Sequence, residues 1–468
     1  MAAILLKSAT TGLAAEFATA TVKVDTTQRF QTIEGFGVNF NGVYYRQAQK
    51  RLLDLLIDDL GASIVRFDPF GQSDWEIQND DGDPHHINWS VFDDRFSTAA
   101  FEASWAAMRA FNQRGIRVLL NVSGTVPAWM LDDKGKPLVP GTCRKEPNPV
   151  HLFTNRPSHL RSDMYAEFAE TVVALASYAR NKAKVRFEWF GPLNETNCYP
   201  IEGPRVDPDE APRLMKEVLT ALDREGLADV NVVFADQAGA GSDYFSPIFS
   251  EPDLMKRVAR FTLHQYGQLA EGYADHFKRI GASAFRDVPI WISEYGDLND
   301  KDRSAANEWT SFCIKGTQRI LDLLGMGATA GLWWDAFDNY HDHDKQMTFY
   351  GLVANENHVY APKKRFYAQR QLYRFVRPGA QRVASTSDNA DLTVQTFVHK
   401  GRVTVVGVAN NAMTVEVPLG RRLLSGQWNL TVTTPSRNGE RADKQLRRDD
   451  EAFRITLDEP SVFTLSQR

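Results

Sequence analysis

The sequence predicts an α/β protein, in which a (β/α)8 barrel is followed by an accessory antiparallel β-sandwich. From about residue 30 to 375, apolar strand-like runs alternate with amphipathic helical stretches, the pattern of a parallel sheet covered by helices. After about residue 377 the strands become short and alternating, with Gly, Asn, Asp and Pro between them. The chain of 468 residues also exceeds the size at which one hydrophobic core usually stops growing.

The strand candidates of the first region share a high content of apolar residues and a polar loop at their C-terminal end. They are TIEGFGVNF, SIVRF, IRVLLNV, KVRFEWF, VNVVFA, RFTLHQY, VPIWIS and ATAGLWW. A barrel of this type needs eight such strands. A doubly wound open sheet would instead place a GxGxxG turn after its first strand, and GFGVNFNGVYY lacks that spacing. The barrel is therefore favoured.

Helical patterns separate these strands. Three of the clearest are RQAQKRLLDLLIDDL, STAAFEASWAAMRAFNQRG and MYAEFAETVVALASYARNK. The third has apolar residues at helical spacing, which predicts one face packed on the sheet: Tyr165, Phe168, Val172, Leu175, Ala176 and Ala179. Gly115 is a helix-stop signal before the next strand.

The domain organisation follows from these changes in pattern. We expect residues 1–29 to form an N-terminal segment, residues 30–376 the barrel, and residues 377–468 the sandwich. The early stretch TATVKVDTTQRF alternates like the C-terminal strands, so we expect it to contribute a strand to the sandwich.

Composition and charge exclude several classes of function. The formal net charge of −5 and pI near 6.1 argue against a surface for nucleic acid or anionic membranes. No apolar run approaches the roughly 20 residues of a membrane span. The N-terminus MAAILLK resembles a signal peptide only faintly, which leaves localisation open; secretion or a periplasmic location is favoured if a signal has been removed, and the cytoplasm otherwise.

The three cysteines, Cys143, Cys198 and Cys313, are too few and too scattered for a disulfide framework, and no CxxC spacing indicates zinc. Cys198 is therefore expected to be a small loop residue.

Polar residues at the C-terminal ends of the strands are the strongest functional signal, because those ends meet at one mouth of a barrel. They recur after one strand candidate after another: Arg66, Asp68, Asn121, Trp129, Asn194, Glu195, His264, Tyr266, Glu294, Trp334 and Asp335. We expect Arg66, Asn121, Trp129, Asn194, His264, Tyr266 and Trp334 to contact substrate at this mouth. Trp75, Trp89 and Trp129 lie in long loops, where an aromatic residue is either a sugar platform or a loop anchor.

Glu195, after the fourth strand, and Glu294, after the seventh, are expected to face each other across the mouth. Opposed carboxyl groups suit the cleavage of a glycosidic bond, in which one donates a proton and the other attacks the anomeric carbon. A separation of about 5–5.5 Å favours a covalent intermediate and retention of configuration.

The surroundings of the two carboxyl groups suggest different roles. Arg66 beside Glu294 is expected to lower the pKa of Glu294, and Tyr266 to donate a hydrogen bond to it. Glu195 has no cation in its local sequence and faces a negative charge, so we expect it to keep its proton. Asn194 is placed to bind the sugar 2-hydroxyl.

The motif HDHD at residues 341–344 and the pair His85 and His86 suggest metal ligands, but the spacing matches no usual metal signature. We expect no metal and no cofactor. Two alternatives stay open: a metal-dependent hydrolase that uses His264, His341 and His343, and a non-catalytic carbohydrate-binding protein.

The chain resembles the clan A glycoside hydrolases in LNET and ISEYG, which hold Glu195 and Glu294. It resembles family 30 more specifically in QTIEGFG, RFDPFGQSDW, TVPAWM and a sandwich assembled from both chain ends, over nearly the whole chain. It departs from the family's pattern at GFGVNF and SGTVPAWM. The resemblance implies that Glu195 is the acid/base and Glu294 the nucleophile of a retaining β-glycosidase or endo-β-glycanase. Its partner would be an oligosaccharide or polysaccharide β-glycoside, whose sugar and linkage stay open, as does the oligomeric state.

Overall fold

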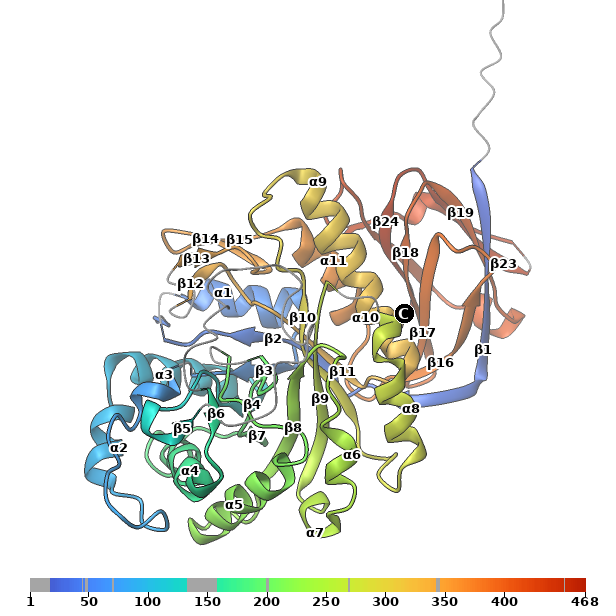
Figure 1. The fold of residues 1–468 in the computed structure, drawn as a ribbon. Helices are drawn as coiled ribbons and strands as arrows, with labels where there is room; N and C mark the ends of the chain where they lie inside the picture. The colour runs from blue at the N-terminus through green and yellow to red at the C-terminus, as the bar shows by residue number, and fades with distance from the viewer. Residues whose placement is uncertain are drawn as a thin grey trace, which may run out of the picture.

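The computed structural model describes residues 17–43, 45–46, 49–69, 71–132, 158–198, 202–267, 270–341, 346–449 and 451–468. It shows a closed parallel barrel beside a β-sandwich (Figure 1). The predicted fold class is confirmed. Within these residues, no helix is both long and apolar enough to cross a bilayer.

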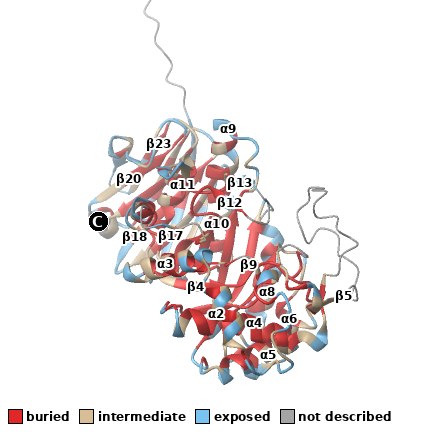
Figure 2. Cartoon of the chain, turned by 90° about the vertical axis from the view of Figure 1, so that its left-hand side faces the viewer, coloured by how far each residue is buried: buried red, intermediate tan, exposed pale blue. Residues whose placement is uncertain are grey.

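Each of the eight predicted strand regions contributes one strand to the barrel, and the strands pair in chain order. They are β2 (Gly35–Phe40), β3 (Ile64–Phe67), β4 (Arg117–Asn121), β7 (Trp189–Gly191), β8 (Asn231–Ala238), β9 (Val258–Tyr266), β10 (Ile290–Gly296) and β11 (Ala330–Trp333). β11 pairs with β2 in parallel and closes the ring. The strands are almost wholly buried, as the continuous apolar runs predicted (Figure 2).

The N-terminal end of the barrel is filled by a cluster of aromatic and charged side chains. Trp189 and Trp291 meet edge to face with ring centroids 4.7 Å apart, and Arg260 lies against both rings. Glu34 accepts hydrogen bonds from Arg260 (2.5 Å) and from the indole of Trp291 (2.6 Å). This cluster blocks one end, so the open mouth lies at the C-terminal ends of the strands.

Helices surround the barrel between the strands (Figure 1). The principal ones are α1 (Lys50–Asp54) with the π-helical continuation η2 (Leu55–Leu60), α3 (Ala99–Gln113), α4 (Tyr165–Asn181), α5 (Ala211–Arg224), α6 (Phe245–Ile248), α7 (Pro252–Met255), α8 (Ala274–Ala282), η8 (Glu308–Lys315) with α10 (Gly316–Met326), and α11 (Lys364–Tyr373). The predicted apolar stripe of α4 is buried. The helix is also buried on its other sides, where Glu167 and Glu170 lie, which the amphipathic pattern did not predict.

Smaller elements lie in the segments that follow the barrel strands. They are α2 (Trp89–Phe96), α9 (Ala305–Asn307), the 3-10 turns η3 (Gln72–Asp74), η4 (Ala128–Met130), η6 (Ser162–Met164) and η7 (Ala270–Tyr273), and three hairpins: β5 (Leu131–Asp132) with β6 (His159–Leu160), β12 (Asn339–His341) with β13 (Gln346–Thr348), and β14 (Val353–Glu356) with β15 (Val359–Pro362).

The sandwich is built from strands at both ends of the chain. In hydrogen-bonded order they are β21 (Glu440–Arg441), β20 (Trp428–Thr433), β24 (Ser461–Gln467), β18 (Arg402–Ala409), β17 (Leu392–His399), β16 (Gln381–Ser387), β1 (Ala18–Thr32), β19 (Met413–Pro418), β23 (Ala452–Leu457) and β22 (Leu446–Arg448). β1 pairs antiparallel with β16 and, at its start, parallel with β19, so this strand joins the two sheets. The division of the chain at residues 30 and 377 stays a prediction.

A second hydrophobic core fills the sandwich and is separate from that of the barrel. The two parts meet along α10 and α11. Gln371 of α11 donates to the Thr433 hydroxyl of β20 and accepts from the Thr464 hydroxyl of β24. The interface thus includes satisfied buried polar contacts as well as apolar packing.

Candidate active site

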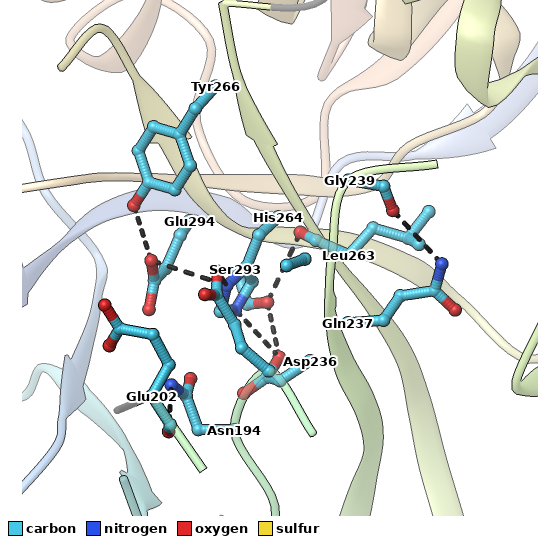
Figure 3. A network of polar contacts seen from close by, with 12 residues as sticks. Asn194, Glu202, Asp236, Gln237, Gly239, Leu263, His264, Tyr266, Ser293 and Glu294 are labelled. Atoms are coloured by element: carbon cyan, nitrogen blue, oxygen red, sulfur yellow. Dashed lines mark hydrogen bonds and ion pairs between the residues drawn. The ribbon is translucent and has the colours of Figure 1, made fainter. Parts of the chain in front are cut away.

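Glu294 lies on β10 in register with His264 on β9, at the C-terminal end of the barrel. Its carboxylate receives a hydrogen bond from Nη1 of Arg66 at 2.7 Å and one from the hydroxyl of Tyr266 (Figure 3). Glu294 is 5% exposed. The expected contacts of Arg66 and Tyr266 with this carboxylate are therefore present.

Glu195 lies in the loop after β7, with a backbone φ of 43°, in the left-handed region that non-glycine residues rarely adopt. Its backbone N–H donates to the carbonyl of Asp236 at 2.8 Å, which ties this unusual conformation to β8. The side chain accepts a hydrogen bond from Nδ1 of His264 at 2.6 Å. Backbone outliers held in this way concentrate at functional sites.

The two glutamates approach closely. A carboxylate oxygen of Glu195, one of Glu294 and a ring nitrogen of His264 all lie within 4.8 Å of one another. Nδ1 of His264 is 2.6 Å from Glu195 and 3.4 Å from Glu294, so the imidazole lies between the two carboxyl groups rather than at the surface of the mouth. His264 is fully buried, and its contact with substrate stays a prediction.

Burial dominates the electrostatics of Glu294. Loss of hydration raises the pKa of Glu294 to about 7, although His264 and Arg66 both favour its charged form. The expectation that Arg66 would hold this pKa below its usual range is wrong, because the cost of desolvation exceeds the attraction of the cation. For His264, burial disfavours the imidazolium, but Glu294, Asp236 and Glu195 together raise the pKa of His264 to about 10.

Asp236 is a further member of the site that the sequence analysis missed. Its carboxylate accepts from Nη2 of Arg66 at 3.2 Å and from the hydroxyl of Ser293 at 2.5 Å, and lies 3.6 Å from Nε2 of His264. It is 1% exposed; burial opposes ionisation, but Arg66 and His264 lower the pKa of Asp236 below its usual range. Asp236 thus lies beside both cations that flank Glu294, Arg66 and His264; Figure 3 shows its position beside His264 and Ser293.

A sequence signal for Asp236 existed, because it follows the apolar run VNVVFA directly, as the other site residues follow their strands. Its backbone φ of 48° and the irregular pairing of β8 with β9 turn its side chain toward Arg66 and His264. Asn39 of β2 was also missed; its amide oxygen accepts from Nη1 of Arg66 at 2.9 Å.

Asn194 is held by protein contacts on both sides of its amide. Its oxygen accepts from Arg66 at 2.7 Å, and its nitrogen donates to the carbonyl of Glu202 at 3.1 Å. Among the described residues, these contacts use one of the two N–H groups of that nitrogen, and the contact of Asn194 with a sugar hydroxyl stays a prediction.

The other predicted substrate contacts lie at the strand ends without touching the two glutamates in the described part of the chain. Asn121 is fully buried, and its amide packs so closely on Gly191 that a Cβ there would be 1.7 Å from the Asn121 oxygen. Trp129 donates from its indole to the carbonyl of Glu76 at 3.1 Å. Trp334 is half-buried beside His341, whereas Trp333 is fully buried, so Trp334 is the member of this pair that reaches the mouth.

Two loop aromatics are structural. Trp75 is 1% exposed and packs edge to face on Phe96 and Phe101. Trp89 lies under the ammonium of Lys182, 4.2 Å from the ring centroid. Both are loop anchors rather than sugar platforms.

The histidines proposed as metal ligands do not come together in the residues that the structure describes. His341 lies 3.3 Å from Asp335 and packs on Trp334, while His343 lies outside the described residues. His85 and His86 contact Arg224 and Asp81 at the surface.

Among the residues that the structure describes, two groups have the spacing of metal ligands: Glu195 with His264 and Glu294, and His159 with Asp207 and Glu210. The first fits a cation poorly. Its histidine is held protonated by its carboxylate neighbours, and Arg66 already neutralises Glu294. In the second, Arg205 takes both oxygens of Asp207, at 3.0 and 3.2 Å.

Cys198, three residues after Glu195, forms a disulfide bond, so the expectation of an unpaired loop residue is wrong. Its spacing in the sequence carried no signal for this. Cys313 is free and buried, and Cys143 lies outside the described residues.

Several solved structures have the same fold as this chain. An endoxylanase of glycoside hydrolase family 30 from Clostridium papyrosolvens superposes with a TM-score of 0.70 at 19% identity, over 96% of this chain and 100% of its own. The chain has the fold of the family 30 glycoside hydrolases. The chain is also similar to a family 30 subfamily 8 xylanase from Clostridium acetobutylicum (TM-score 0.69, 16% identity, 96% of this chain and 100% of the other) and to an endo-beta1,6-glucanase (TM-score 0.67, 17% identity, 97% and 95%). No family model and no curated protein sequence matches.

Proposed function

We propose that the protein is a retaining β-glycoside hydrolase, in which Glu294 is the nucleophile and Glu195 the acid/base. The observation that carries this proposal is the pair of buried carboxyl groups, with oxygens within 4.8 Å of each other at the mouth of the barrel. This spacing is close to the separation of about 5–5.5 Å in retaining enzymes and shorter than the roughly 6.5–9.5 Å that leaves room for a water in inverting ones. The β configuration and the glycan substrate are supported by the similar structures named as xylanases and an endo-beta1,6-glucanase.

In the first step, ionised Glu294 attacks the anomeric carbon and forms an ester, while the bond to the leaving oxygen breaks. Glu195 transfers its proton to that oxygen. Arg66 and Tyr266 bind the Glu294 carboxylate and hold it toward the sugar, and Nδ1 of His264 lies beside both glutamates, 2.6 Å from Glu195 and 3.4 Å from Glu294.

In the second step, the charge of Glu294 has been lost to the ester, so Glu195 is a carboxylate beside a neutral group. It accepts a proton from water as the water oxygen attacks the anomeric carbon, and the ester bond to Glu294 breaks. The two inversions give net retention. Asn194 is positioned to hydrogen-bond a sugar hydroxyl with its remaining N–H, and Trp334 offers an aromatic surface to the ring.

The assignment predicts that Glu294→Ala abolishes the turnover of an activated aryl β-glycoside and that azide restores it, because azide can occupy the space left by the carboxylate. The product should be the α-glycosyl azide, which is identified by NMR. Glu102→Ala, on the exposed face of α3, is the control and should keep full activity. Near-normal turnover by Glu294→Ala would overturn the assignment.

A covalent adduct distinguishes an enzyme from a carbohydrate-binding protein. A 2-fluoroglycoside should label the wild-type protein at Glu294, as located by mass spectrometry of peptides. A protein that binds glycan without forming an adduct would support the binding alternative.

A further inference from the structure

The sandwich carries a hollow of about 450 Å3 that is separate from the barrel mouth. It lies on the rim of the sandwich where β20, β22 and β23 approach the last residue of the chain; β20 and β23 are labelled in Figure 2. β21 and β22 are the two ends of the hydrogen-bonded strand order, and both contribute to the hollow. The hollow is therefore at the open seam between the two sheets. Its volume is within the roughly 300–1,000 Å3 of small-molecule sites.

The floor of the hollow is apolar and aromatic. Trp428 and Phe453 lie with ring centroids 5.0 Å apart, inclined by 54°, and Leu446 lies beside them. Phe453 is buried, whereas Trp428 is half-buried. The indole N–H of Trp428 donates to the carbonyl of Leu423 at 3.0 Å, so its polar edge is satisfied within the protein. What remains is an apolar ring surface of the kind on which the C–H face of a sugar packs.

The rim of the hollow is positively charged. It carries Arg441, Arg448 and Arg468, with the amides of Gln427 and Asn429 between them, and the described lining residues include no Asp or Glu. Nη2 of Arg441 donates to Asn429 at 2.7 Å and also forms an ion pair with Asp443. Nη1 of Arg448 donates to the carbonyl of Leu424 at 2.9 Å, which fixes the guanidinium while its other N–H groups stay available for a ligand.

This local positive charge contrasts with the formal net charge of the whole chain, which is −5. Because the whole chain is net negative, it does not attract anions from a distance. The arginines therefore act only on a ligand that is already in contact with them. Guanidinium groups bind carboxylates through two parallel hydrogen bonds, while an adjacent aromatic surface selects a ring with a flat apolar face. An acidic sugar has both features.

We propose that this hollow, which we call the seam site (Gln427, Trp428, Asn429, Arg441, Arg448 and Phe453), binds a saccharide bearing a carboxylate, a uronic acid unit. The sugar ring packs on Trp428 and the carboxylate pairs with Arg448 and Arg441. The seam site would hold an acidic glycan against the protein away from the barrel mouth. This inference uses the proposed function only for the kind of ligand, because the contacts lie wholly within the sandwich.

The test measures binding to the full chain with Glu294→Gln, so that no saccharide is consumed. Titration with tri-galacturonate, followed calorimetrically, should show binding that weakens by about tenfold or more in Arg448→Ala and Trp428→Ala, the scale of a lost charge-assisted pair. Arg447→Ala is the matched control. Arg447 is the neighbouring exposed arginine of β22, does not line the hollow, and points to the opposite side of the strand.

Two further probes define the ligand. Cellotriose, which is neutral, should bind more weakly than tri-galacturonate and show no dependence on Arg448. Acetate alone should compete only at far higher concentration, because it lacks the ring that packs on Trp428. Equal binding of tri-galacturonate to the Arg448→Ala and Arg447→Ala proteins, or equal affinity for acetate and the trisaccharide, would overturn the seam site.

Failure of the proposed function gives a different result. If the proposed function is wrong, the wild-type protein does not hydrolyse aryl β-glycosides, or hydrolyses them without need of Glu294, while the binding differences at the seam site persist. If the seam site is wrong, the binding differences vanish while turnover still depends on Glu294. Hydrolysis of a small aryl glycoside should be the same in the Arg448→Ala and Arg447→Ala proteins that retain Glu294.

Discussion

Asp236 lies beside both cations of the candidate active site, Arg66 and His264. Its buried negative charge affects the protonation of the groups around it. It contacts Arg66 at 3.2 Å and lies 3.6 Å from His264, and both of these groups contact Glu294. Two adjacent buried cations would repel each other without an anion between them. The geometry therefore makes Asp236 a positioning residue for the carboxyl pair.

The pH dependence of activity tests whether Asp236 affects the ionisation of Glu294. Because burial raises the pKa of Glu294 to about 7, the ionised nucleophile becomes scarce in acid, and kcat/KM of the wild-type protein should fall roughly tenfold per pH unit below about pH 7. Asp236→Asn removes a negative charge beside this group, which favours the ionised form of Glu294, and so should move that fall to lower pH. It should also lower kcat by about tenfold or more, because Arg66 and His264 lose the carboxylate beside which both are positioned.

The control for this substitution is Asp322→Asn on α10, a half-buried carboxyl group with no contact to the site. It should leave the pH profile unchanged. A merely structural Asp236 would lower the amount of folded protein without moving the pH of the acid limb. An acid limb of the wild-type protein near pH 4, the ordinary range of a glutamate, would contradict the account of Glu294.

At the scale of elements, α4 is a helix whose burial carries an electrostatic cost. Glu170 lies on it at 0% exposure, and neither of its carboxyl oxygens has a hydrogen-bond partner among the described residues. Burial raises the pKa of Glu170 to about 9, and Asp80, Glu76 and Glu167 add repulsion. Burial likewise raises the pKa of Glu76 to about 7.

These shifts predict how stability depends on pH. A glutamate whose pKa is higher in the folded than in the unfolded chain is neutral in the folded protein while it ionises in the unfolded one, so folding stability falls as pH rises between about 4.5 and about 9. Glu170→Gln removes this contribution, which is worth up to about 1.4 kcal/mol per pH unit. Relative to wild type, the variant should gain stability steadily from about pH 5 to about pH 8.

Thermal unfolding at several pH values measures this difference. Glu102→Gln, an exposed glutamate on α3, is the matched control and should show the same pH slope as the wild type. A Glu170→Gln protein whose slope equals that of the wild type would show that Glu170 ionises normally in the folded state.

At the scale of the whole molecule, the N-terminal strand joins the two ends of the chain. β1 lies between β16 and β19, and its Val22 is fully buried in the core of the sandwich while Lys23 is exposed. If β1 no longer packed into the sandwich core, the strand that pairs with both β16 and β19 would be lost, and the two sheets would separate.

Val22→Asp tests the importance of the strand. It buries an unpaired charge and should cost at least about 3 kcal/mol of folding stability, whereas Lys23→Asp places the same side chain in water and should cost little. Calorimetric unfolding of both variants measures the difference. Equal melting temperatures would contradict the role of β1 in the sandwich core.

The sequence predicted the barrel because its evidence is local. SIVRF, IRVLLNV and VPIWIS are each apolar on both faces, and a helical pattern lies between them; that combination has few solutions other than a parallel sheet wrapped by helices. The contribution of the N-terminal strand to the sandwich could also be predicted, because TATVKVDTTQRF alternates like the C-terminal strands. Only the last two residues of KVRFEWF, Trp189 and Phe190, lie in β7, because pairing with β4 and β8 decides where a strand begins and ends.

The same local rule located Glu195, Glu294, Arg66, His264 and Tyr266, because strand ends in a closed barrel share one mouth. It could not locate Asp236 with its neighbours, since the distances from Asp236 to Arg66 and His264 depend on the bend of β8. Nor could it place Trp75 in the core, which depends on its packing against Phe96 and Phe101, or predict the disulfide bond of Cys198.

The amino-acid sequence by itself determined which side chains reach the mouth, because a strand's length and apolar pattern set where its polar end emerges. Only the tertiary structure decided their protonation. The pKa of Glu294 results from the balance between lost hydration and nearby cations, and both depend on how completely the barrel closes around that one carboxylate.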